Sequence, residues 1–272
     1  LEKLGFDVTY LPVDSTGKVD LRELEAALRH DTFLISVMYG NNEVGTLQPI
    51  VPIGELARER GILFHVDAVQ AFGHVKLDLT ALPVDMMSFS AHKLHGPKGI
   101  GALYVSGRIS ISPLLHGGSQ ERKRRAGTEN VAGIAGFAKA SVLACESLDE
   151  SRKHLERLRA EMVAELDRLL GSDSFVVNGH PSERLPHILN ISFPGIDTET
   201  MLMNLDLEGV AAASGSACTS GSLTLSHVLR AMELPEDVMR SAVRFSFGRT
   251  QPIEHIRAAA QKIATISRRI RK

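Results

Sequence analysis

The chain has 272 residues, of which 43% are hydrophobic and 23% are charged, a composition typical of a globular protein with one large core or two smaller ones. Its 31 basic and 32 acidic residues give a net charge of −1, which argues against binding nucleic acid or an anionic membrane through bulk charge. Two cysteines are too few for a disulfide scaffold and fit a reducing compartment such as the cytoplasm, and no apolar run is long enough to span a membrane.

The residues before about position 140 alternate between short apolar runs and amphipathic segments. The run TFLISVMY at 32–39 is continuously apolar, which is typical of a strand buried on both faces of a parallel sheet. Asp20 precedes leucines at helical spacing, so it is expected to cap a helix over 21–29. Strands and helices that alternate through short connections favour βαβ units. The other elements expected in this half are strands at 6–13, 62–68, 84–90 and 101–105 and a helix at 53–61.

The pattern changes near residue 140. Apolar spacing predicts one long helix over 138–170, followed by short strands, a helix that begins near Asp197, a further strand and a terminal helix. Strands and helices mixed in this way indicate an α+β arrangement. We therefore expect an α/β protein with a large, mainly parallel domain at 1–148 and a smaller α+β domain at 149–272.

Lysine, serine and histidine cluster where the predicted strand 84–90 ends. In open α/β sheets, ligands bind beyond the carboxyl ends of the strands. At such a place Lys93 can be partly desolvated, which favours the neutral amine that forms a Schiff base. Ser90 and His92 add hydrogen-bond donors that suit a phosphate. The alternative is a surface turn with solvated lysines.

A carboxylate follows the preceding strand at the same edge of the predicted sheet. Asp67 can pair with a protonated ring nitrogen, as in pyridoxal phosphate (PLP) enzymes, or it can cap the segment that follows. His65 shares its side of the strand, and could stack on a ring or be a packed core histidine. Gln70 and Asn42 offer neutral hydrogen bonds near strand ends, although Asn42 also fits a simple turn.

Two residues in the second half of the chain are candidates for a functional role. The small-residue run at 211–222 predicts a mobile loop in which the thiol of Cys218 is the reactive group. Cys145 lies among apolar neighbours and is expected to be a core residue or a bystander without a functional role. Arg244 lies within an apolar strand and needs an anionic partner. That partner could be a substrate carboxylate or an internal acidic residue.

Two other functions are less favoured by the sequence. The basic segment 120–130 lacks the aromatic residues of a nucleic-acid platform, so a solvated or phosphate-facing loop is the better interpretation. No HExxH or Cys-x-x-Cys motif supports a metal site at the histidines at positions 92, 95 and 116, and we expect no metal.

Taken together, these motifs closely resemble those of the NifS/IscS-type cysteine desulfurases, which are class V aminotransferase-like PLP enzymes of fold type I. The resemblance runs over essentially the whole chain in the same order. The motifs are NNEVGTLQPI (41–50), FHVDAVQ (64–70), SFSAHKLHGPKGIGALYV (88–105), RRAGTENVAGI (124–134) and SGSACTSGSLTLSHVLRAM (214–232).

The resemblance implies a role for each matching residue. Lys93 would bind PLP covalently and Cys218 would accept the sulfur. The remaining implied roles concern the cofactor and the substrate: Asp67 pairs with the ring nitrogen, Gln70 with the ring oxygen, Ser90 and His92 with the phosphate, Thr128 with the phosphate of a neighbouring subunit, and Asn42 and Arg244 with the substrate carboxylate.

By the same resemblance, the protein would convert L-cysteine to L-alanine as a homodimer and pass a persulfide to an iron–sulfur scaffold or a thiolation enzyme. The family's N-terminal phosphate loop and ring-stacking histidine have no counterpart in this sequence, so we expect an N-terminally truncated chain. The alternatives are a selenocysteine lyase or another class V PLP enzyme, or an inactive fragment that only dimerises or binds a scaffold.

Overall fold

The computed structural model describes residues 1–215 and 225–271. The chain forms two compact units, each built from segments that are separated in the sequence. The three-stranded unit consists of Leu1–His30, Gly40–Pro49 and Asp149–Lys272, and the four-stranded unit consists of Asp31–Tyr39 and Ile50–Leu148.

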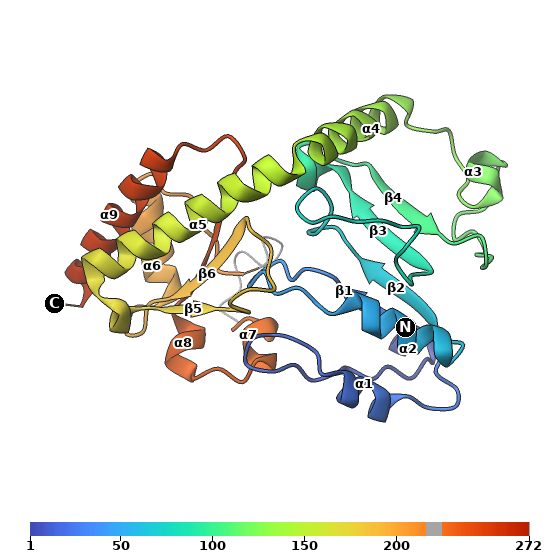
Figure 1. Ribbon diagram of the computed structural model, residues 1–272, viewed down its shortest axis with the longest axis horizontal. Helices are drawn as coiled ribbons and strands as arrows, with labels where there is room; N and C mark the ends of the chain where they lie inside the picture. Colours follow the sequence, from blue (N-terminus) through green and yellow to red (C-terminus); the bar gives the residue numbers. More distant parts are fainter. Residues whose placement is uncertain (216–224, 272) are drawn as a thin grey trace. The chain divides into compact units, whose positions relative to one another are not determined.

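The four-stranded unit is built on a sheet with the strand order β1-β2-β3-β4 (Figure 1). The first three strands are parallel and the fourth is antiparallel to its neighbour. The strands are β1 (Leu34–Met38), β2 (Leu63–Asp67), β3 (Met86–Ser90) and β4 (Gly101–Val105), and the helices are α2 (Ile50–Glu59), η2 (Ala91–Leu94), α3 (Gln120–Lys123) and α4 (Val131–Glu146).

Alternation along the strands separates the two faces of this sheet. In β1, Ile35 and Val37 are buried while Ser36 and Met38 are exposed, as the period of two in a strand requires. The amphipathic helix α2 contacts β2 and buries Ile53 among its apolar side chains. A second cluster joins α4 to η2 and to the end of β3; its buried members are Ala91, Leu94, Phe137, Ala140 and Ala144.

The three-stranded unit contains an antiparallel sheet with the order β5-β6-β7. Its strands are β5 (Val176–Asn178), β6 (Ile188–Ser192) and β7 (Ala242–Ser246). Its helices are η1 (Glu2–Leu4), α1 (Leu21–Ala27), α5 (Leu148–Leu170), η3 (Ser172–Ser174), α6 (Thr198–Leu207), α7 (His227–Ala231), α8 (Glu236–Arg240) and α9 (Ile253–Ile270).

The core of this unit lies on one face of its sheet. Leu189 of β6 and Phe245 of β7 are paired in register and pack with apolar residues of α5, α6 and α9. The next pair along the strands, Asn190 and Arg244, therefore points to the opposite face. This second face also receives Glu43, whose backbone carbonyl accepts a hydrogen bond from Asn190.

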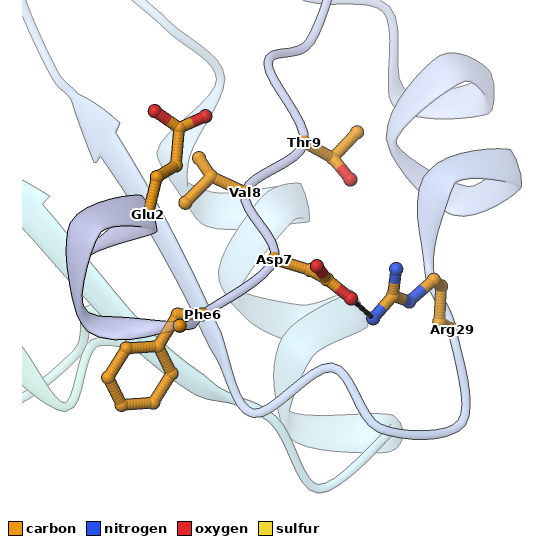
Figure 2. Close-up of a pocket in the computed structure, with 7 residues that line it drawn as sticks. Glu2, Phe6, Asp7, Val8, Thr9 and Arg29 are labelled. Carbon is orange, nitrogen blue, oxygen red and sulfur yellow. Dashed lines mark hydrogen bonds and ion pairs between the residues drawn. The ribbon is translucent and has the colours of Figure 1, made fainter.

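The fold class is confirmed, and most of the expected elements are present. Asp20 caps α1 as predicted, because its carboxylate accepts a hydrogen bond from the backbone N–H of Arg22 at 2.8 Å. The strand expected at 6–13 is wrong, since these residues form no strand within the described chain. An extended segment needs a ladder partner to become a strand. Instead, residues 6–9 line an open pocket in which Asp7 pairs with Arg29 at 2.9 Å (Figure 2).

The single helix expected over 138–170 is also wrong. The structure has two helices, α4 and α5, that are separated at Ser147. Ser147 ends α4, and its hydroxyl donates to the carbonyl of Leu143 at 2.8 Å. Asn130 begins α4 earlier than expected, because its side chain accepts from the backbone N–H of Gly133.

The predicted boundary at residue 148 and the compact units disagree over residues 1–30 and 40–49. The prediction assigns these residues to the large domain, whereas they belong to the same compact unit as residues 149–272. The division into domains 1–148 and 149–272 stays a prediction. No single helix in the described part of the chain is long and apolar enough to cross a membrane.

Candidate active site

The predicted cofactor residues lie at the carboxyl ends of two neighbouring parallel strands. Asp67 ends β2 and is paired in register with Ser88 of β3. The backbone N–H of Ala68 donates to the carbonyl of Ser88 at 3.0 Å, so the ladder continues to this edge. Asp67 Oδ1 accepts from the backbone N–H of Val69 at 2.9 Å, which fixes the orientation of the carboxylate. This is the capping role considered from the sequence.

Lys93 lies on the short helix η2, directly after β3. Ala91 and Leu94 take the inward positions of this helix and are buried, so Lys93 points outward. The expected desolvation of its amine is therefore absent in this chain, where the side chain is exposed. The sequence places Lys93 correctly at the sheet edge but does not reveal which face of the turn it occupies.

Ser90 and His92 form a hydrogen-bonded pair at the same edge. The Oγ of Ser90 lies 2.7 Å from Nδ1 of His92. If the hydroxyl donates to the ring, the hydrogen on Nε2 remains for another acceptor; if Nδ1–H donates, the hydroxyl hydrogen remains. The pair therefore always keeps one donor, as expected for a phosphate contact.

His65 bridges two serines across three adjacent strands. Its Nδ1 lies 2.8 Å from Oγ of Ser36 in β1, and its Nε2 lies 2.8 Å from Oγ of Ser88 in β3. Burial lowers the pKa of His65, and the nearby charge of Asp67 acts in the opposite direction. His65 is thus a half-buried, neutral bridge between strands, with both ring nitrogens in use.

Two other predicted cofactor residues lie outside the strands and helices. Gln70 is half-buried in the turn that follows β2, three residues after Asp67. Thr128 is exposed in the segment before the Asn130 cap of α4.

The predicted substrate residues lie together in the three-stranded unit. Nη1 of Arg244 donates to the backbone carbonyl of Asn42 at 2.9 Å. Nε of Arg244 is buried and has no hydrogen-bond partner within the described residues. Burial lowers the pKa of the Arg244 guanidinium, and the charge of Glu43 counteracts this effect. The arrangement combines an internal acidic neighbour with a donor that is still free for an anion.

The structure describes only one of the two cysteines. Cys218, the predicted sulfur acceptor, lies outside the described residues. Cys145 is a free thiol on α4 and is exposed, so its interpretation as a core residue is wrong. It belongs to the outward face of that helix, where apolar neighbours such as Leu143 are exposed as well.

Sequence reasoning missed Glu43 and Ser226. Glu43 is only 3% exposed, and its carboxylate accepts from the hydroxyl of Ser226 at 2.6 Å. An acidic residue directly after a predicted polar turn was the available signal, although the turn alone predicts an exposed side chain. Within the described residues, no group of three histidine, cysteine, aspartate or glutamate side chains is placed to hold a metal ion.

Comparison with known proteins identifies the family. The family described as Aminotransferase class-V matches residues 1–258. The chain belongs to the class-V aminotransferase family. It is 50% identical over 271 residues to the IscS 1 protein of Bacillus subtilis (strain 168), covering 99% of this chain and 71% of the relative. It is also 47% identical over 271 residues to the cysteine desulfurase IscS of Methanosarcina thermophila, covering all of this chain and 66% of the relative.

Solved structures agree with this assignment. A structure described as a NifS-like protein matches with a TM-score of 0.88 and 40% identity, over 97% of this chain and 69% of its own. The resemblance to the IscS and NifS group is thereby confirmed. The first curated relatives extend beyond the match, because the chain spans 62% to 71% of their length.

Proposed function

We propose that this chain carries the lysine, the substrate-binding arginine and the sulfur-accepting cysteine of a PLP-dependent cysteine desulfurase. The reaction converts L-cysteine to L-alanine and leaves a persulfide on Cys218. The carbon–sulfur bond of the substrate breaks, a sulfur–sulfur bond forms, and the carbon that loses sulfur gains a proton. No external oxidant is needed, because the carbon is reduced as the sulfur is oxidised. The family match over residues 1–258 supports this proposal.

The residues at the edge of the four-stranded sheet suit PLP. Lys93 offers an exposed side chain, and Asp67 offers a carboxylate whose Oδ1 is held by the backbone N–H of Val69. The pair of Ser90 and His92 offers at least one donor to a phosphate oxygen. When bound, PLP supplies a ring that accepts electrons from the α-carbon of the amino acid. Lys93 is then the group placed to move the proton between the α-carbon and the carbon that loses sulfur.

The single observation that best supports a carboxylate substrate is the unpartnered Nε of Arg244. A buried donor without a partner is costly, typically by about 1–3 kcal/mol, and more for a charged group. A substrate carboxylate would satisfy it through a charge-assisted bond, while the carbonyl of Asn42 holds the other side of the guanidinium in place. Asn42 thus orients Arg244 through its backbone carbonyl.

We further propose that the protein acts as a cytoplasmic homodimer that passes sulfur to an iron–sulfur scaffold or a thiolation enzyme. The even charge balance and the exposed apolar side chains of α4 support a protein partner. These side chains are Val131, Ile134, Val142 and Leu143. Sedimentation analysis with PLP bound measures the dimer; a monomer at micromolar concentration would contradict it.

The function is tested by adding PLP and L-cysteine to the purified chain and measuring alanine. We expect alanine and persulfide sulfur in equal amounts. Cys218→Ser abolishes both products, whereas Cys145→Ser, the matched control at the exposed cysteine, leaves them unchanged. Alanine formation at the normal rate by Cys218→Ser would contradict the role of Cys218.

The lysine assignment is tested separately from turnover. Borohydride reduction after PLP binding fixes the cofactor to its lysine, and peptide mass spectrometry locates it. We expect the label on Lys93, its loss in Lys93→Ala and its retention in Lys98→Ala, the neighbouring exposed lysine. A label that persists in Lys93→Ala would contradict the assignment.

A further inference from the structure

Glu43 is a buried carboxylate whose backbone is held on two sides. Its N–H donates to Oδ1 of Asn41 at 2.8 Å, and its carbonyl accepts from Nδ2 of Asn190 at 3.3 Å. Asn190 is itself fully buried and accepts from Nδ2 of Asn178 at 2.7 Å. These bonds lie within the three-stranded unit, so the position of Glu43 is set by the β5–β6 sheet.

The carboxylate of Glu43 is hydrogen-bonded to Ser226 and lies close to Gly215, and these two residues flank one segment of the chain. Oε2 accepts from the hydroxyl of Ser226 at 2.6 Å. A Cβ atom placed on Gly215 would lie 3.1 Å from the same oxygen, closer than most side-chain contacts allow. Gly215 and Ser226 enclose residues 216–225, which include Cys218. The oxygen atom that accepts from Ser226 at one end of this segment therefore also lies beside Gly215 at the other end.

Ser226 connects the carboxylate to a helix as well. Its Oγ accepts from the backbone N–H groups of Val228 and Leu229 at 3.1 and 3.3 Å, which makes Ser226 the N-cap of α7. The hydroxyl of Ser226 donates to Glu43, and its oxygen accepts from the helix. Both the donor and the acceptor function of this side chain are therefore used.

The same carboxylate acts on the substrate-binding arginine. The charge of Glu43 counteracts the effect of burial on the Arg244 guanidinium, and Arg244 is bonded to the adjacent residue, Asn42. A buried carboxylate without compensation is costly, and the hydroxyl of Ser226 and the positive charge of Arg244 both offset the burial of Glu43.

We propose that Glu43 is a positioning residue that holds one end of segment 216–225 through its hydrogen bond to Ser226 and limits the position of the other end by close packing at Gly215. This proposal rests on the proposed function, since the benefit of the anchor is to place Cys218 relative to the bound substrate. Loss of the anchor should slow sulfur transfer more than it weakens substrate binding, because a misplaced nucleophile lowers the rate of a step without removing contacts to the substrate.

The anchor is tested by hydrogen exchange on the purified chain, compared with alanine production. Glu43→Ala should raise exchange in peptides covering 210–215 and 226–231, and lower kcat about tenfold or more with KM changed less than about twofold. Glu43→Gln keeps an acceptor oxygen of the same size, so protection at both ends should persist. Glu236→Gln, an exposed carboxylate in the same unit, is the control and should alter neither quantity.

A second variant tests the contact at the other end and does not depend on removing the carboxylate. Gly215→Ala should push against Oε2 and raise exchange at 226–231, although the changed residue lies before the segment. In the background of Glu43→Ala the same change should have no further effect on these peptides, because the opposing oxygen is gone. Equal, additive effects in both backgrounds would overturn the proposal, as would unchanged exchange in Glu43→Ala. Altered exchange in a chain that makes no alanine at all would contradict the proposed function and leave the anchor standing.

Discussion

Nη1 of Arg244 donates to the carbonyl of Asn42, 202 residues earlier in the chain, at 2.9 Å. The bond joins β7 to the turn that follows β1, and Nε of Arg244 is buried without a hydrogen-bond partner among the described residues. A guanidinium held on one side and free on the other is suited to a carboxylate, because its planar donors bind such groups in pairs.

Replacing this guanidinium by an ammonium should weaken substrate binding selectively. We expect Arg244→Lys to raise KM for L-cysteine by about 10- to 100-fold, the effect of losing a charge-assisted hydrogen bond. Steady-state kinetics measures the change. Arg240→Lys, on the neighbouring exposed helix α8, is the matched control, and an unchanged KM in Arg244→Lys would remove Arg244 from the substrate site.

Protonation of His65 should lower stability in mild acid. Its pKa is depressed in the folded protein, mainly by burial, so the unfolded chain binds the proton more tightly. The neutral bridge is therefore fully stabilising above the unfolded pKa, near 6.5, and is lost as pH falls below that value. Chemical denaturation at pH 7.5 and 5.5 should show a smaller loss of unfolding free energy in His65→Asn than in the wild type. Equal losses in the two proteins would contradict this assignment.

Gly54 should not tolerate a side chain, although alanine normally favours a helix. A Cβ at this position in α2 would lie 2.3 Å from the carbonyl oxygen of Pro83. We expect Gly54→Ala to destabilise the protein by about 1–3 kcal/mol, the usual cost of overpacking, instead of stabilising it through helix propensity. Urea unfolding measures the difference. Gly107→Ala, which meets no atom within 4 Å, should be close to neutral, and a stabilised Gly54→Ala would contradict the packing.

Arg159 should matter for folding, not for catalysis. It is 7% exposed on α5, and burial lowers the pKa of its guanidinium to about 10. Its Nη1 donates to the carbonyl of Ile188 in β6 at 3.1 Å. Arg159→Ala leaves that carbonyl unpaired and should cost about 2 kcal/mol in unfolding free energy. Arg168→Ala, an exposed arginine on the same helix, should change little; equal losses would show that the bond to β6 is not important.

The sequence predicted the β2 and β3 strands and their polar ends well, because apolar runs that stop at Asp67 and Ser90 mark both the strand and its edge. It failed at 6–13, where a strand-like pattern pairs with no strand in the described part of the chain, since pairing is not a local property. It also failed at Ser147, because serine interrupts neither apolar spacing nor helix propensity strongly enough to predict a break.

For the site, the motifs identified the residue types but not their surroundings. The outward position of Lys93 depends on Ala91 and Leu94 filling the inward side of a single turn, which periodicity over four residues cannot resolve. Glu43 escaped notice because its burial arises from Ser226 and Asn190, which lie more than 140 residues away. Long-range burial of a polar residue has no local signature.

The interleaving of the two units constrains the order in which the protein can be made. Residues 40–49 leave the ribosome well before 149–272, yet Val44 packs with Leu229, Met232 and Ala242. During synthesis this turn therefore stays unpacked until the last third of the chain has been made. Until then the side chains of Val44 and Glu43 are exposed to solvent. The three-stranded unit closes late, and a nascent chain stopped before α7 would expose the turn to chaperones and proteases.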